Sequence, residues 1–68
     1  MPQDIIAQNL ESIFKRASDH PAFDGELFKN RDYDGMCKVG GDVCDWTLIA
    51  IEAEDALRAY KKLKKNRK

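Results

Sequence analysis

Residues 36–51, MCKVGGDVCDWTLIAI, decide which fold this chain adopts. Gly40 and Gly41 form a two-residue insert between residues 36–39 and 42–46, and two glycines can take the positive φ angles of a β-hairpin turn. The following run, residues 47–51, is apolar and contains β-branched side chains, which is typical of a central strand buried on both faces. This stretch therefore predicts short strands.

The same residues can instead begin a long helix. One face of that helix would hold Trp46, Ala50, Ala53 and Leu57, and the opposite side Cys44, Leu48 and Ile51. A helix that is apolar all round must be surrounded by protein, and a 68-residue monomer offers little to surround it. We therefore prefer the strands and keep an all-α three-helix bundle as the alternative.

Two helices flank the stretch. Apolar side chains recur at steps of three and four from Asp4 to about Asp19, and Pro21 disfavours helical geometry at His20. Residues 55–65 begin after acids, with Asp55 as N-cap, and end in lysines, the order that the helix dipole favours. Asp-Gly pairs at 24–25 and 34–35 are further turn signals. We predict one small α+β domain over residues 1–68: an N-terminal helix, an antiparallel β-meander of two or three strands, and a C-terminal helix.

Length and composition exclude several classes of protein. The longest apolar run covers residues 48–51, which is far short of the ~18 residues of a membrane span. The first residues, MPQD, have no basic start, so no secretory signal is expected and a cytoplasmic location is predicted. The chain has one histidine and no glycine-rich loop followed by Lys-Ser/Thr. We expect no enzymatic activity, no catalytic residues and no cofactor.

The net charge is zero, but acids and bases are distributed unevenly along the chain. All twelve acids and five of the twelve bases lie in residues 1–57, whereas residues 58–68 hold seven bases and no acid. The chain is therefore an acidic body with a basic C-terminal tail, residues 61–68.

An acidic surface of this kind indicates a protein partner with a basic groove. The residues that would form the surface are Asp24, Glu26, Asp32, Asp34, Asp42 and Asp45. We expect a small non-enzymatic interaction protein that binds its partner stoichiometrically, as inhibitors and regulators encoded by phages and mobile elements do. A solvated face with no partner is the plainer interpretation of the same acids.

Two other partners are considered. Nucleic acid would be contacted through the phosphates by a basic helix end and tail made of Lys61, Lys62, Lys64, Lys65, Arg67 and Lys68. A second copy of the chain would form a homodimer and bury more of Ile5, Ile13, Phe14, Tyr60 and Leu63. We expect no membrane partner.

Cys37 and Cys44 would face each other across the predicted hairpin. Six residues separate them, whereas paired zinc ligands are two to four apart, and a disulfide needs an oxidising compartment. Asn30, Asp32 and Asp34 resemble the start of an EF-hand loop, but Gly41 stands where the bidentate Glu belongs. We therefore expect two free thiols and no bound metal.

Overall fold

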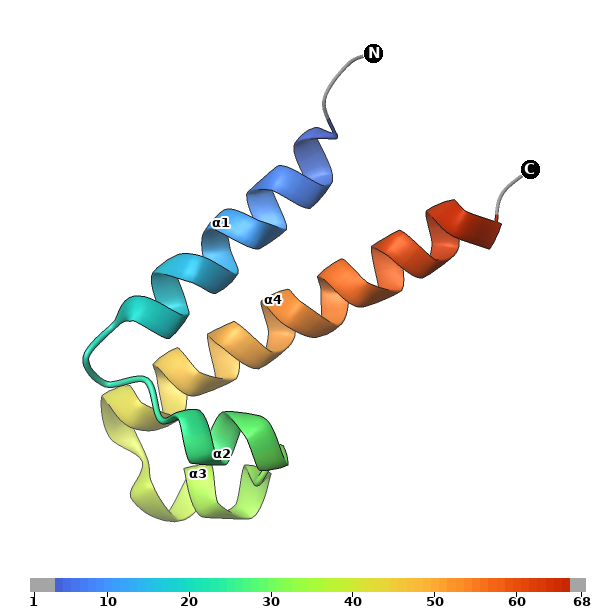
Figure 1. Ribbon diagram of the computed structural model, residues 1–68. Helices are drawn as coiled ribbons and strands as arrows, with labels where there is room; N and C mark the ends of the chain where they lie inside the picture. The colour runs from blue at the N-terminus through green and yellow to red at the C-terminus, as the bar shows by residue number, and fades with distance from the viewer. Residues whose placement is uncertain (1–3, 67–68) are drawn as a thin grey trace.

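The computed structural model describes residues 4–66, and the side chains of residues 4–65. It contains four helices: α1 (Ile5–Asp19), α2 (Gly25–Asn30), α3 (Tyr33–Val39) and α4 (Gly41–Asn66) (Figure 1). No strand occurs among the described residues, so the predicted α+β meander is wrong. The all-α alternative is the correct class, with four helices in place of three.

The N-terminal helix agrees with its prediction. Asp4 is the N-cap of α1, and its carboxylate accepts a hydrogen bond of 3.2 Å from the Ala7 amide. His20 follows the last helical residue in an extended conformation, as the preceding-proline effect requires. The His20 N–H donates to the Ala17 carbonyl, which satisfies one of the last acceptors of the helix.

Two short helices occupy the place of the predicted strands. Asp24 caps α2 by accepting from the amides of Glu26 and Leu27, at 3.0 and 3.1 Å. Asp32 caps α3 by accepting from the Gly35 amide at 2.9 Å. The Asp-Gly pairs predicted as turns therefore belong to helix starts. Asp24 is an N-cap, as aspartate favours, and Asp34 lies in the first turn of α3 behind the cap residue Asp32.

The two adjacent glycines separate α3 from α4. Gly40 and Gly41 have φ angles of 66° and 60°, so the chain does need glycine here, but the turn joins two helices and no hairpin. From Gly41 the chain is helical through 26 residues. Residues 47–51 are one part of this helix, and Asp55 lies inside it, so its prediction as an N-cap is wrong.

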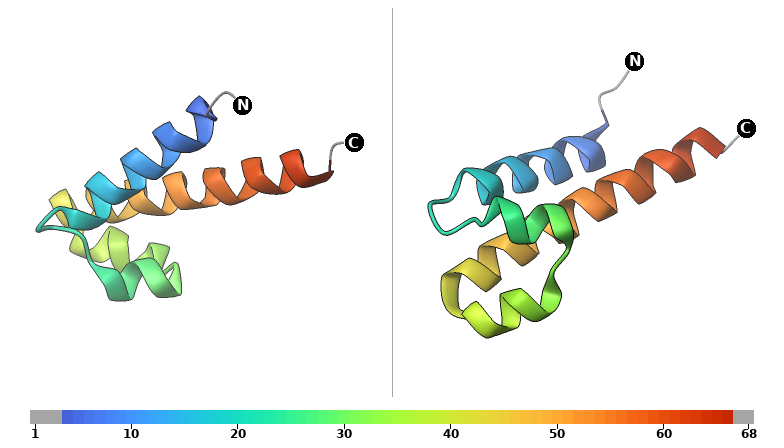
Figure 2. Two further views of the ribbon diagram at one scale, coloured as in Figure 1. Left: turned by 45° about the horizontal axis from the view of Figure 1, so that its top comes forward. Right: turned by 60° about the horizontal axis from the view of Figure 1, so that its bottom comes forward.

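Helix α4 is covered on two sides in its N-terminal half (Figures 1 and 2). Helix α1 lies antiparallel along one side, and α2 and α3 lie on another. The buried side chains are Ala17, Met36, Thr47, Ala50, Ile51 and Ala53. The two short helices thus supply the surrounding protein that a helix apolar on all sides requires. The preference for strands over a long helix is wrong because α2 and α3 cover the second apolar side of α4.

Thr47 connects α4 to the start of α2. Its side chain is fully buried, and its hydroxyl oxygen accepts a hydrogen bond of 3.0 Å from the Asp24 amide. Ile51 lies one turn further along α4 on the same face and is also buried. None of the described helices is long and apolar enough to cross a membrane.

Candidate functional site

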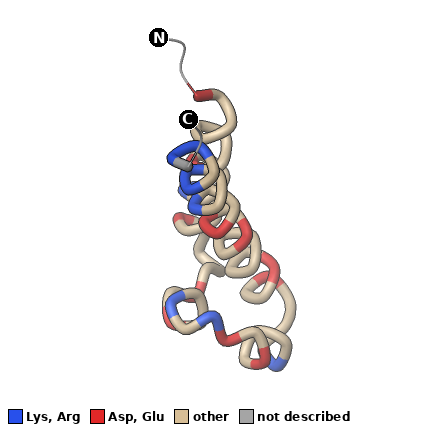
Figure 3. The backbone as a smooth tube through the Cα atoms, turned by 90° about the vertical axis from the view of Figure 1, so that its right-hand side faces the viewer, with Lys and Arg blue, Asp and Glu red and all other residues tan. Residues whose placement is uncertain are grey.

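The six predicted acidic residues lie at the starts of three helices, two each at α2, α3 and α4, at the opposite end of α4 from its lysines (Figures 1 and 3). The two short helices α2 and α3 also carry the exposed Lys29 and Lys38. The roles of the six acids differ. Asp24 and Asp32 use their carboxylates as N-caps, whereas Glu26, Asp34, Asp42 and Asp45 are exposed. No ion pair of these four is found among the described residues. We name Glu26, Asp34, Asp42 and Asp45 the acidic end.

Arg31 fixes the short helices against α4. It ends α2 in a left-handed conformation with φ of 51°. Its guanidinium donates to the Phe28 carbonyl at 2.7 Å, to Glu54 at 2.5 Å and to Asp55 at 3.0 Å. Hydrogen bonds to Glu54, and then to Asp55, raise the pKa of Arg31. Arg31 and Arg58, which lies 3.8 Å from Glu54, together balance the two carboxylates, so Glu54 and Asp55 add little to the acidic surface.

The basic residues of α4 gather near its C-terminus (Figure 3). Three of them face carboxylates: Arg58 pairs with Glu54 at 3.8 Å, Lys61 with Glu11 at 3.7 Å, and Lys64 with Asp4 at 2.8 Å. Lys62 and Lys65 are exposed, and no ion pair involves them among the described residues. The remaining tail residues of the prediction, Arg67 and Lys68, lie outside the described residues.

Asp4 connects the start of α1 to the C-terminal turns of α4. Besides capping α1, its carboxylate accepts from the Lys64 ammonium at 2.8 Å and from the Tyr60 hydroxyl at 3.0 Å. The Lys64 hydrogen bond is the largest influence on the Asp4 carboxyl and lowers its pKa, with further lowering from Ala7 and Tyr60. Partial burial opposes this shift without cancelling it. Lys64 is therefore engaged with Asp4 within the chain.

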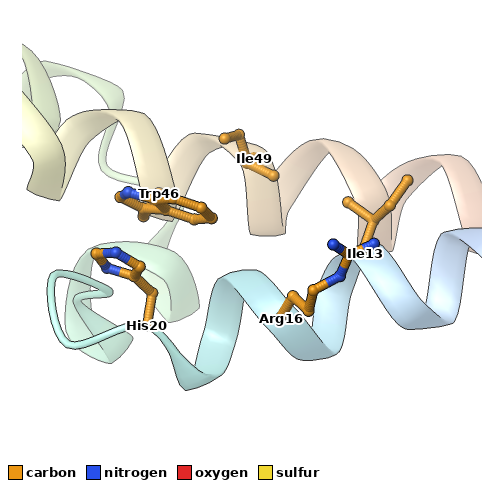
Figure 4. A pocket seen from close by; sticks show the side chains of 5 residues that line it. All are labelled: Ile13, Arg16, His20, Trp46 and Ile49. Atoms are coloured by element: carbon orange, nitrogen blue, oxygen red, sulfur yellow. The ribbon is translucent and has the colours of Figure 1, made fainter.

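A groove between α1 and α4 was not predicted. It has a volume of about 390 Å³ and is lined by Ile13, Arg16, His20, Trp46 and Ile49 (Figure 4). The His20 and Trp46 rings stack at one end, with centroids 4.0 Å apart and planes 9° from parallel. The His20 Nδ1 accepts from the Ala22 amide at 3.0 Å, which holds the ring in place. The sequence signal was the α1 stripe, whose members Ile6 and Ile13 remain exposed.

The thiols and candidate metal ligands are dispersed. Cys37 is exposed on α3 and Cys44 is half-buried on α4, so the facing pair expected from a hairpin does not exist. Within the part of the chain that the structure describes, no three His, Cys, Asp or Glu side chains converge on one point that could hold a metal ion. Asp32 and Asp34 belong to a helix start and form no calcium loop.

Comparison with known proteins gives no further assignment. No family model, no curated protein and no solved structure matches this chain.

Proposed function

We propose that this chain is a non-enzymatic binding protein whose acidic end docks onto a basic surface of another protein. The observation that carries the proposal is that Glu26, Asp34, Asp42 and Asp45, in the first turns of α2, α3 and α4, are all exposed and form no ion pair among the described residues. Carboxylates in this state are free to meet lysines and arginines of a partner. Stoichiometric occupation of a basic groove would make the chain an inhibitor or regulator of that partner.

The acidic end is carried by restrained backbone. Asp24 and Asp32 cap the helices that hold Glu26 and Asp34, and Arg31 clamps the end of α2 to α4. Binding through such residues loses little backbone entropy, which favours affinity. The carboxylates themselves steer a basic partner toward this end and increase the association rate.

The basic end is too distant to oppose this interaction. The molecule measures 43 Å along its longest axis, and α4 runs from the acidic end to the lysines (Figure 1). Charges in solution are screened over about 8 Å at physiological ionic strength. Residues 24–45 hold six acids against three bases, Lys29, Arg31 and Lys38, so a basic partner at this end meets a net negative charge although the net charge of the chain is zero.

The test is affinity capture from the native host with the tagged full chain and two matched variants. The acidic-end variant carries Glu26→Gln, Asp34→Asn, Asp42→Asn and Asp45→Asn, which keep the side-chain shapes and leave both N-caps intact. The control variant carries Lys62→Gln and Lys65→Gln. We expect a defined protein to be captured by the wild type and the control, with binding lost in the acidic-end variant. Capture that survives the acidic-end changes would contradict the proposal.

Nucleic-acid binding is the second candidate. Arg58, Lys62 and Lys65 share one face of α4, at steps of four and three, where they could follow a line of phosphates. Against this, Glu54 partly neutralises Arg58, and Asp4 holds Lys64. Nuclease treatment separates the two functions, because capture that is lost with nuclease and in the lysine variant would support nucleic acid instead.

A further inference from the structure

One face of the α1–α4 pair exposes several large apolar side chains to solvent. Ile13 and Ile49 stand on either side of the groove and are 40% and 36% exposed. Two adjoining hollows continue the groove along α4, one beside Leu48 and the other beside Leu10 and Ala53. Ile6 near the start of α1 and Leu63 near the end of α4 are exposed as well. This apolar face, which we name the groove face, lies away from α2 and α3.

The residues of the groove face follow the spacing of helices that pack in bundles. On α4 they recur at alternating steps of three and four: Trp46, Ile49, Ala53, Ala56, Tyr60 and Leu63. On α1 the steps of four and three recur at Ile6, Leu10, Ile13 and Ala17, of which Ala17 is fully buried. A repeat of 3.5 residues is the pattern by which helices interdigitate in coiled coils and four-helix bundles. Ala17 and Ala53 are already buried in the single chain, whereas Ile6, Ile13, Ile49 and Leu63 remain exposed and can pack against further helices.

The accessible surface area of the chain is larger than that of a compact monomer of the same mass, as expected for a subunit of a dimer. The chain exposes 5181 Å², whereas a compact monomer of its mass exposes about 4,400 Å². Its radius of gyration is 13.6 Å, against about 11 Å for a compact chain of this length. The excess surface is close to the ~800 Å² that each partner buries in a protein–protein interface of standard size.

The charges beside the groove are self-complementary. Arg16 on α1 lines the groove with Ile49, and Glu52 on α4 lines the adjoining hollows with the same isoleucine. A two-fold axis along the groove sets α1 of each copy over α4 of the other, so that Arg16 approaches Glu52 of the second copy, twice. A two-fold axis across the groove would instead set α1 over α1 and α4 over α4, so that Arg16 of one copy would not lie over Glu52 of the other. Of the two arrangements, the first pairs Arg16 with Glu52.

We propose that the groove face binds a second copy of this chain and that the product is a symmetric four-helix bundle of two α1–α4 pairs. Ile13, Ile49 and Trp46 of each copy form the centre of the interface. Arg16 and Glu52 form its rim and select the orientation of the copies, because rim charges contribute mainly to specificity.

Sedimentation equilibrium of the full chain tests this proposal. We expect a particle of twice 7.8 kDa that dissociates on dilution. Ile49→Asp should raise the dimer dissociation constant by more than about 100-fold, since each dimer would bury two unpaired carboxylates. The matched control is Val39→Asp on α3, at a residue that is 58% exposed and lies outside the groove face. A wild type that stays monomeric at millimolar concentration, or a dimer that Val39→Asp breaks and Ile49→Asp does not, would overturn the proposal.

Charge reversal tests how the two copies are oriented, and the changed side chains are exposed, so the fold should be kept. Arg16→Glu and Glu52→Arg should each weaken the dimer by about five- to tenfold, because each breaks both rim pairs. The double variant should restore wild-type dissociation, with circular dichroism confirming the same helix content throughout. A double variant that is weaker than both single variants would exclude the axis along the groove.

Discussion

At the residue scale, Thr47 is the side chain whose chemistry most directly links α4 to the short helices. Its buried hydroxyl accepts from the Asp24 amide, which itself begins the capped turn of α2. Thr47→Val keeps the shape but leaves that amide without its acceptor, so we expect a loss of about 1–3 kcal/mol in the free energy of unfolding. Thr47→Ser keeps the hydroxyl and loses only a methyl group, about 1 kcal/mol. Urea denaturation of both variants decides, and a valine variant at least as stable as the serine variant would refute this role.

Asp4 gives the fold a pH dependence of defined sign. Its folded pKa is lowered, chiefly by Lys64, from the ordinary value of about 3.9 in an unfolded chain. The carboxylate therefore stabilises the fold above that pH, and the contribution is lost as pH falls through the folded pKa. We expect wild type to be more stable than Asp4→Asn at pH 7, with the difference shrinking below about pH 4. Thermal denaturation at both pH values measures this, and a difference that does not change with pH would contradict it.

At the element scale, the break between α3 and α4 depends on backbone conformation alone. Gly40 has φ of 66° and ψ of −168°, a region open almost only to glycine, and an added Cβ would meet nothing closer than 3.9 Å. Gly40→Ala should therefore cost about 1–3 kcal/mol of stability through strain and not through a clash. Gly25→Ala is the control, because that residue is helical and its Cβ would meet only Phe23 at 3.8 Å. It should be neutral or stabilising, and equal losses in the two variants would disprove the explanation.

The elements also show how far the sequence predicts this fold. Helix α1 has four turns of apolar periodicity, an Asp cap and a closing proline, so its bounds follow from local signals. Helices α2 and α3 have six and seven residues, too few for a periodic pattern. They form where tertiary contacts hold them, through Thr47 to Asp24 and through Arg31 to Glu54. Without them residues 47–51 resemble a buried strand, because both structures are apolar on two sides.

The candidate site also has a part that the sequence predicts and a part that depends on the tertiary structure. The six acidic residues were predicted from composition, and the fold does bring them to one end of the molecule. That Asp24 and Asp32 are helix caps could not be known without α2 and α3. The ion pairs of Lys61 and Lys64 also depend on tertiary placement, because their partners Glu11 and Asp4 lie near the other end of the chain.

At the scale of the whole molecule, three surfaces are distributed along the long helix α4. The acidic end lies around the start of α4 and the basic residues lie near its C-terminus (Figures 1 and 3). The groove face lies along α1 and α4 between them. Asp45 stands where the acidic end meets the groove face, since it lines a hollow with Trp46 and Leu48. A second copy at the groove face would therefore cover Asp45 and leave Glu26, Asp34 and Asp42 for a partner at the acidic end.

The central claim is that the acidic end is the binding surface, and an NMR titration tests it most directly. The full ¹⁵N-labelled chain is titrated with an oligo-arginine peptide at physiological ionic strength, with the acidic-end variant as control. We predict saturable amide shifts at Glu26, Asp34, Asp42 and Asp45, no shifts at Lys62 and Lys65, and a lost response in the variant. Shifts of equal size along the whole chain, or a response that the variant retains, would contradict the claim.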